Sequence, residues 1–314
     1  MPADARPATW KILLAFAIIY FVWGSTFLVI RVGVREVPPL LFAAMRFLAA
    51  GVLLYAWLIA RGGRSPTLRQ WTSASFLGFI IFVVDYGLLF WSEKRIPSGI
   101  AAVMLATIPA FMSLAEIFIL RTQKLTLRLA LAFVIGTGGV AVLVSRSLNL
   151  GGAPVDPWSA LALIIAAISW SVASALTRKL PLPESKVMSS AAQMLAGGLL
   201  LVIFAFAFGD FHGFQPAKLP LEVWLSLAYL VVFGSIVAFT AYVWLIHHES
   251  PTKVGTYGYV NPVVAVLIGY FFGGEGLGLR TILGTALVLV SVVVITTASA
   301  KKPVSLRHVE DAAD

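Results

Sequence analysis

The sequence contains no cysteine and few charged residues. Without cysteine, the chain can form neither disulfides nor zinc–thiolate sites, and it has no cysteine nucleophile. Charged residues make up 12% of the chain and apolar residues 60%, whereas a soluble domain averages roughly 25% and 45–50%. A chain of this composition cannot cover an apolar core with polar surface, so the lipid bilayer is its expected surrounding.

Basic residues outnumber acidic ones, which gives the chain a formal net charge of +9. They lie in the short segments between apolar runs, where membrane proteins carry them. No basic stripe with interleaved aromatic residues is present, so nucleic acid is not an expected partner. The sequence also lacks a nucleophile elbow, a zinc-binding His-Glu-x-x-His pattern and a phosphate-binding glycine loop. We therefore expect no enzyme activity, no metal site and no cofactor.

Ten apolar runs are long enough to cross a bilayer, whose core of about 30 Å requires roughly 20 helical residues. They lack the alternation of barrel strands, so helices are expected. The first run is interpreted as a spanning helix and not as a signal peptide, because no small-residue cleavage site follows it. The predicted spans are 12–30, 38–60, 71–92, 97–120, 126–145, 158–178, 186–208, 221–246, 251–273 and 278–299.

The distribution of lysine and arginine predicts the orientation of the chain. With the N-terminus in the cytoplasm, fifteen of them fall on the cytoplasmic side and seven on the other. Because cytoplasmic loops are enriched in these residues, both termini are predicted to be cytoplasmic. The predicted location is a bacterial inner membrane. The sequence leaves the oligomeric state open between a monomer and a homodimer.

Two stretches of the chain resemble each other. Residues 44–54 align with residues 191–201, and six of the eleven positions are identical. The same offset places Trp23 on Trp170, and a slightly larger one places Pro109 on Pro262. Five spans in each half, an odd number, would make the halves enter the membrane from opposite sides, as in many secondary transporters. The predicted fold is an all-α integral membrane protein of ten transmembrane helices in two inverted five-helix repeats.

This repeat predicts the organisation of the whole chain. The predicted segments are a cytoplasmic N-terminus (1–11), a first five-helix repeat (12–147), a periplasmic linker (148–157), a second five-helix repeat (158–299) and a cytoplasmic tail (300–314).

Several motifs resemble those of a known family. They are Trp23-Gly24-Ser25-Thr26, Arg46-Phe47, Pro97-Ser98-Gly99-Ile100-Ala101-Ala102, Pro109, Tyr257-Gly258-Tyr259-Val260-Asn261-Pro262-Val263-Val264-Ala265 and Gly274-Glu275. Together they resemble the EamA-type, ten-helix branch of the drug/metabolite transporter superfamily. The resemblance covers about residues 10–300. It implies export of amino acids, related metabolites or drugs through a central cavity, without a nucleotide-driven motor.

The sequence departs from the family pattern at two places. Thr122-Gln123 stands in the first half where the second half has Gly274-Glu275, so the two gates are not expected to be chemically equivalent. The acidic residues Asp85 and Glu116 also lie outside the family pattern.

Charged residues inside the predicted spans are candidates for function, because a charge at a helix centre costs roughly 2.5–3.5 kcal/mol. Arg46 and Asp85 lie at matching depths of neighbouring spans. One interpretation is a buried salt bridge between them. The other is that both line a cavity and bind the two ends of a zwitterion. Glu116 lies five residues from Arg121 and is expected to extend toward the interface, although a proton-coupling role is a second interpretation for it. Glu93 lies at an outer edge.

Aromatic residues away from the membrane interfaces form a second group of candidates. They either pack between helices or form an aromatic cavity wall that suits aromatic amino acids or cations. Gln193 stands at the repeat-related position of Arg46, and Asn261 precedes Pro262. The predicted substrate-binding residues are Trp23, Arg46, Asp85, Tyr86, Trp170, Gln193, Tyr242, Tyr257, Tyr259 and Asn261. The predicted hinge or gate residues are Gly24, Pro109 and Pro262, since prolines break helices near transporter sites.

These features predict a secondary transporter that exports a small polar metabolite, with amino acids or related compounds as the leading substrates. A multidrug or organic-cation exporter is the alternative, because Asp85 among aromatic neighbours could hold a positive charge. A proton is one candidate coupling ion, with Asp85 or Glu116 as the candidate coupling residue, and the sequence leaves facilitated diffusion open as well.

Overall fold

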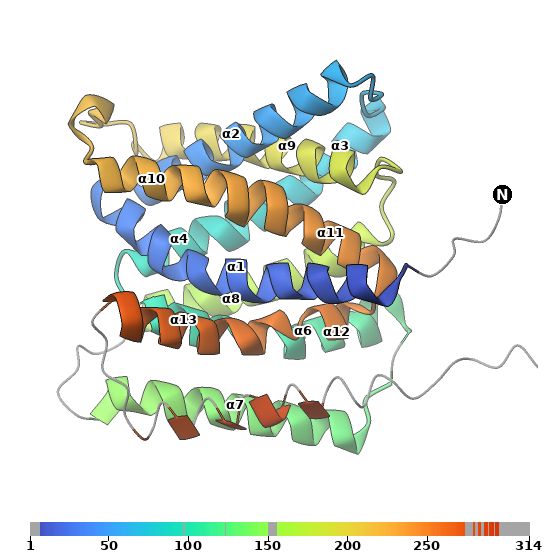
Figure 1. Cartoon of the computed structure of the whole chain (residues 1–314), viewed down its shortest axis with the longest axis vertical. Coiled ribbons are helices and arrows are strands. Elements are labelled where there is room, and N and C mark those ends of the chain that lie inside the picture. The colour runs from blue at the N-terminus through green and yellow to red at the C-terminus, as the bar shows by residue number, and fades with distance from the viewer. Residues whose placement is uncertain are drawn as a thin grey trace, which may run out of the picture.

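The computed structural model describes residues 7–96, 98–122, 124–149 and 156–273, and single positions between 279 and 294. Every element of this described part is a helix. The helices run side by side, from α2, α3 and α9 at one edge through α1 and α8 to α13 and α7 at the other (Figure 1). The predicted tenth span, 278–299, lies largely outside the described residues.

Seven helical segments of the described part are apolar and long enough to cross a membrane. They coincide with seven of the predicted spans to within a few residues. They are α1 (Thr9–Glu36), α2 (Pro39–Ala60), the continuous α3, η1 and α4 (Leu68–Gly78, Phe79–Tyr86, Gly87–Glu93), α8 (Pro157–Thr177), α9 (Lys186–Ala207), the continuous α10, η4 and α11 (Leu221–Tyr229, Leu230–Val237, Ala238–His248), and α12 with α13 (Pro251–Val254, Tyr257–Gly273).

Two more predicted spans are helical but are divided or differently bounded. The fourth, 97–120, consists of α5 (Ser98–Leu105), α6 (Ile108–Ala115) and η2 (Glu116–Leu120). The fifth is α7 (Leu127–Asn149), and the short η3 (Pro216–Lys218) lies in a loop.

Polar side chains fix where several helices begin. Thr67 and Gln70 form a reciprocal capping box at α3. Asp210 accepts hydrogen bonds from the backbone N–H groups of Leu40 (3.0 Å) and Leu41 (3.1 Å), and so caps α2 from a distant loop. Asp156 caps α8. The Ser159 hydroxyl donates to Asp156, which holds the pKa of that carboxyl below its usual value.

Wide helical turns interrupt the third helix of each predicted repeat. The segments η1 and η4 are both π-helical and both eight residues long. Helix α2 packs against η4, and α9 packs against η1. Because π turns insert extra residues into a helix, they change which side chains face inward, and they often lie at functional sites.

Helices α2 and α9 cross at glycines with reciprocal neighbours. A Cβ on Gly51 would lie 2.5 Å from the backbone nitrogen of Leu195, and a Cβ on Gly198 would lie 2.5 Å from that of Leu48. The alignment pairs Gly51 with Gly198 and Leu48 with Leu195, so the two contacts are equivalent. Such reciprocity is what a local twofold axis between the two helices produces.

The two helices with proline candidates break at different places. The interruption between α5 and α6 lies at residues 106–107, immediately before Pro109. In the other half the interruption lies between α12 and α13, whereas Pro262 lies inside α13. The expectation of breaks at matching prolines is therefore wrong for Pro262. The two interruptions nevertheless meet, because a Cβ on Gly255 would lie 3.3 Å from the Cα of Pro109.

Candidate functional site

An aromatic cluster lies where helices of both halves meet. The Trp23 ring of α1 lies edge-on to the Trp170 ring of α8, with a centroid distance of 5.4 Å. Tyr257 of α13 lies 4.9 Å from Trp23, and Tyr242 of α11 lies 4.8 Å from Trp170. Tyr86, the last residue of η1, lies 5.9 Å from Trp170. The structure thus brings together five of the six aromatic residues predicted from the sequence.

A small cavity of about 40 Å³ opens beside this cluster. A water molecule needs roughly 10–15 Å³ of such space, whereas drug-sized ligands occupy pockets of about 300–1,000 Å³. As it stands, the cavity has room for a few water molecules only. Its described lining consists of Trp23, Thr26, Phe27, Asp85, Tyr86, Leu89, Leu105, Ile108, Trp170, Tyr257 and Asn261.

Asp85 is the charged residue in this described lining. Its side chain is 3% exposed, and Oδ1 has no hydrogen-bond partner in the described part of the chain. The indole Nε1 of Trp170, also in the lining, is buried without a partner as well. A buried polar group without a partner is costly. One carboxylate among aromatic rings is an arrangement that attracts a cation.

Arg46 lies outside the lining of this cavity. It is fully buried, and its Nε donates to Ser235 Oγ in η4 at 2.9 Å. Its guanidinium stacks on the rings of Phe47 (4.5 Å) and Tyr86 (5.1 Å). Among the described residues the only ion pair is Lys253–Glu249. The predicted salt bridge between Arg46 and Asp85 is therefore wrong, and the Tyr86 ring contacts both Arg46 and the cavity.

Both terminal nitrogens of Arg46 are buried without partners within the described ranges. Glu93, placed by the sequence at an outer edge, is also buried, with 1% of its side chain exposed. Neither carboxylate oxygen of Glu93 has a hydrogen-bond partner among these residues. Arg46 and Glu93 are thus both buried in the protein interior, without an ion pair between them.

Two predicted site residues lie elsewhere. Gln193 is buried in α9, where its Nε2 donates to Ser189 Oγ one turn earlier at 3.0 Å. Tyr259 packs toward α7, because a Cβ on Gly136 would lie 3.0 Å from its ring. Neither belongs to the described lining of the cavity, and a substrate-binding role for them stays a prediction.

Asn261 joins α13 to α1 at the edge of the cavity. With its amide nitrogen facing the two carbonyls, it donates to the backbone of Tyr20 (3.0 Å) and of Tyr257 (3.1 Å). Gly24 lies at the same crossing, where an added Cβ would lie 2.6 Å from the Cβ of Val264. This glycine therefore permits close helix approach, and the predicted gating role for it stays a prediction.

Glu116 is buried and does not extend toward the interface. Its side chain is 2% exposed. Its carboxylate accepts hydrogen bonds from the backbone N–H of Thr252 at 3.2 Å and from the Thr252 hydroxyl. Ser113 Oγ lies 2.8 Å from the same hydroxyl. The expectation of a snorkelling Glu116 is wrong, because Thr252 at the start of α12 donates hydrogen bonds to its carboxylate inside the protein. The cluster joins α6 and η2 to α12 at the end of the bundle where α1 begins.

Glu116→Ala is expected to loosen this end of the bundle. It removes the acceptor of two hydrogen bonds that Thr252 donates, at a cost of about 1–3 kcal/mol. Because the chain has no native cysteine, Leu105→Cys in the cavity lining can report access by its rate of reaction with a soluble thiol reagent. The rate should rise roughly 5- to 100-fold when Glu116→Ala is added. An unchanged rate, with Glu249→Ala as the matched acidic control, would contradict a closing role.

Sequence reasoning missed several residues of the site. The lining also contains the ordinary apolar and small residues Thr26, Phe27, Leu89, Leu105 and Ile108. Ser174 hydrogen-bonds to Tyr242, and Ser235 holds Arg46. A serine in the middle of an apolar span was the only sequence feature that could have indicated Ser174 and Ser235. It is not specific, because many such serines bond only to the backbone of their own helix.

Comparisons with known proteins show what the whole chain is similar to. The EamA-like transporter family matches residues 9–145 and again residues 157–297. The inner membrane transporter YedA of Escherichia coli (strain K12) is 39% identical over 300 residues, which cover 94% of each chain. Protein PecM of Dickeya dadantii is 26% identical over 276 residues, or 87% of this chain and 88% of PecM. A crystal structure that is 22% identical aligns over 93% of this chain and 98% of its own, with a TM-score of 0.71, and supports the fold alone.

Proposed function

Because this chain belongs to the EamA-like transporter family, we propose that it is a secondary transporter exporting small metabolites with a positively charged amino group, amino acids foremost. It is a multi-pass protein of the inner membrane, like its Escherichia coli relative. One observation supports the substrate class. Asp85 brings a buried carboxylate oxygen without a partner to an aromatic cavity that has no cationic side chain in its described lining.

The architecture we propose is two inverted five-helix repeats with both termini in the cytoplasm. Three observations support the repeat. Gly51 and Gly198 have reciprocal neighbours, and η1 and η4 have equal lengths. Trp23 and Trp170, which the alignment pairs, touch each other. Residues related by a twofold axis can touch only close to that axis, so the cavity would lie at the interface of the repeats, where transporters bind substrate.

Transport would require this cavity to open, since about 40 Å³ is too small for an amino acid. The crossing of the two interrupted helices at Pro109 and Gly255 is the place we propose for the change. Release of the hydrogen bonds between Glu116 and Thr252 would open the cytoplasmic side, and α5 and α13 would separate on the other. Protonation of Asp85 when substrate leaves would couple export to the proton gradient.

A second candidate function is export of organic cations. An amino acid also carries a carboxylate. Its partner would be Arg46, which contacts the ring of Tyr86, a residue of the cavity lining. A cation without a carboxylate would need no such partner. The described lining, with one acidic residue and aromatic rings, also suits this second class.

Competition in liposomes separates the two classes. With purified protein and a labelled amino acid, we expect a proton gradient to drive transport and unlabelled amino acids to inhibit it. Inhibition by quaternary amines and not by amino acids would favour the organic-cation exporter. If neither amino acids nor quaternary amines inhibited transport of any substrate found in a screen, the proposal of a cation-selective cavity would be contradicted.

A further inference from the structure

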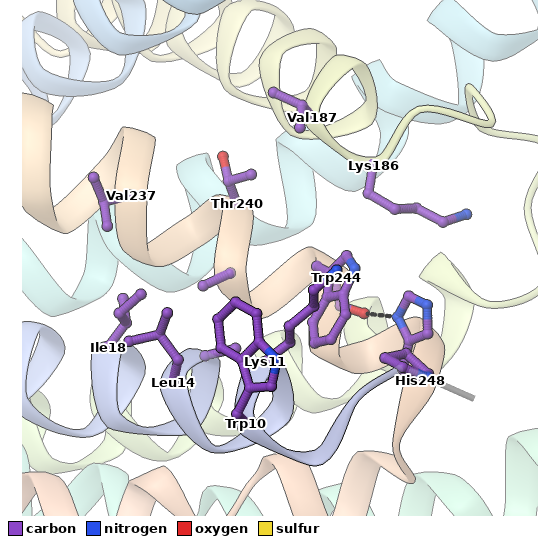
Figure 2. A pocket seen from close by; sticks show the side chains of 13 residues that line it. Trp10, Lys11, Leu14, Ile18, Lys186, Val187, Val237, Thr240, Trp244 and His248 are labelled. Atoms are coloured by element: carbon purple, nitrogen blue, oxygen red, sulfur yellow. Dashed lines mark hydrogen bonds between the residues drawn. The ribbon is translucent and has the colours of Figure 1, made fainter. Parts of the chain in front are cut away.

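A second, larger hollow lies apart from the central cavity. It is a groove of about 610 Å³ between α1 and α11, at the end of the bundle where α1 begins. It shares no lining residue with the central cavity. Figure 2 shows Trp10 and Lys11 of α1 on one wall and Thr240 and Trp244 of α11 on the other.

One end of the groove is basic. Lys11, Lys186 and His248 lie in its lining, which contains no aspartate or glutamate among the described residues. Neither lysine has a carboxylate within 4.0 Å in the described part of the chain, where Lys253 and Glu249 form the ion pair. This end therefore offers two uncompensated positive charges to an anionic group.

The rest of the groove is apolar and faces outward. Leu14 and Val237 contribute to its walls and are exposed, as is Trp10, which is 62% exposed. In an inner membrane protein these side chains face lipid and not water. Thr240 also lines the groove (Figure 2).

We propose that this groove binds one anionic phospholipid of the adjacent leaflet. The phosphate contacts Lys11 and Lys186, the headgroup region packs against Trp10 and Trp244, and an acyl chain lies between α1 and α11. Clusters of lysine beside membrane helices attract anionic lipids, and tryptophan prefers the level of the headgroups. The inference depends on the membrane location and not on the substrate, so a failed transport assay leaves it standing.

A phospholipid in the groove would influence the central cavity through α1 and α11, the two helices that it contacts. Helix α1 carries Trp23 and α11 carries Tyr242, whose rings lie 5.2 Å apart in the aromatic cluster. A ligand that binds the folded protein alone also raises its apparent stability. Phosphatidylglycerol should therefore raise the melting temperature of the purified chain more than phosphatidylethanolamine does.

Native mass spectrometry of the full chain in detergent tests the proposal. With matched acyl chains, phosphatidylglycerol should bind about 30-fold more tightly than phosphatidylethanolamine, from the two lysines. The double variant Lys11→Gln, Lys186→Gln should lose that difference. The matched variant Lys94→Gln, Arg95→Gln, at the opposite end of the bundle, should keep it. Equal affinity of the two lipids, or unchanged preference in the lysine variant, would overturn the proposal.

Two further measurements keep the test independent of variant folding. Brominated phosphatidylglycerol should quench tryptophan emission of the unmodified chain more than brominated phosphatidylethanolamine, and the excess should vanish in Trp10→Phe, Trp244→Phe. Equal quenching by both lipids would contradict the proposal. Soluble glycerol phosphate should not compete with the lipid. Full competition would instead assign the lysines to a free phosphate compound.

Discussion

Asp85→Asn is expected to abolish most transport while leaving the fold intact. The substitution keeps the size of the side chain and removes the negative charge that faces the aromatic cavity. A hydrogen bond to a charged group contributes about 1.5–3 kcal/mol, so affinity for a substrate with an amino group should fall roughly 10- to 100-fold. Transport by purified protein in liposomes measures this loss, and substrate-induced quenching of Trp23 and Trp170 measures binding.

The thermal stability of Asp85→Asn distinguishes a substrate-binding role of Asp85 from a structural one. A buried carboxyl group whose Oδ1 lacks a hydrogen-bond partner destabilises the fold, so replacing it should leave the melting temperature unchanged or raise it. A side chain that holds the fold together gives the opposite result, lower stability with normal transport. Glu93→Gln is the matched control, because Glu93 is an equally buried acid outside the described lining of the cavity. Normal transport by Asp85→Asn would end the substrate proposal.

Hydropathy was sufficient to predict most of the architecture. An apolar run of about 20 residues has one structure available in lipid, because only a helix satisfies its own backbone hydrogen bonds there. The chain therefore shows seven of the predicted spans as continuous apolar helical segments. The alignment pairs Trp23 with Trp170, and their rings touch in the structure.

The partners of the charged residues could not be predicted, and the π segments explain why. Asp85 lies inside η1, Glu116 begins η2, and the partner of Arg46, Ser235, lies inside η4. A regular helical period predicts the face of each side chain, but every π turn shifts that period. Matching depths of Arg46 and Asp85 therefore did not produce matching faces. Asp85 faces the aromatic cavity, and Arg46 faces η4.

Gly198→Ala is expected to be among the most destabilising single changes in the chain. The new Cβ would lie 2.5 Å from the backbone nitrogen and 2.7 Å from the Cα of Leu48. Backbone atoms cannot move aside as a flexible side chain can, so α2 and α9 must separate. Overpacking of this kind costs about 1–3 kcal/mol and occasionally more. Thermal unfolding in detergent, followed by the loss of the monodisperse peak in size-exclusion chromatography, measures the cost.

Because Gly51 and Gly198 have reciprocal neighbours at the crossing of α2 and α9, a second prediction follows for Gly51. Gly51→Ala should destabilise the chain to a similar degree, because its Cβ would lie 2.5 Å from the backbone of Leu195. Once either methyl group has separated the helices, the second methyl group causes a smaller further loss of stability. The double variant should therefore lose less stability than the sum of the two single losses. Gly138→Ala is the matched control, since no atom of the described residues lies within 4 Å of its Cβ position. Equal effects of Gly198→Ala and Gly138→Ala would contradict the close crossing, and strict additivity would contradict the shared axis.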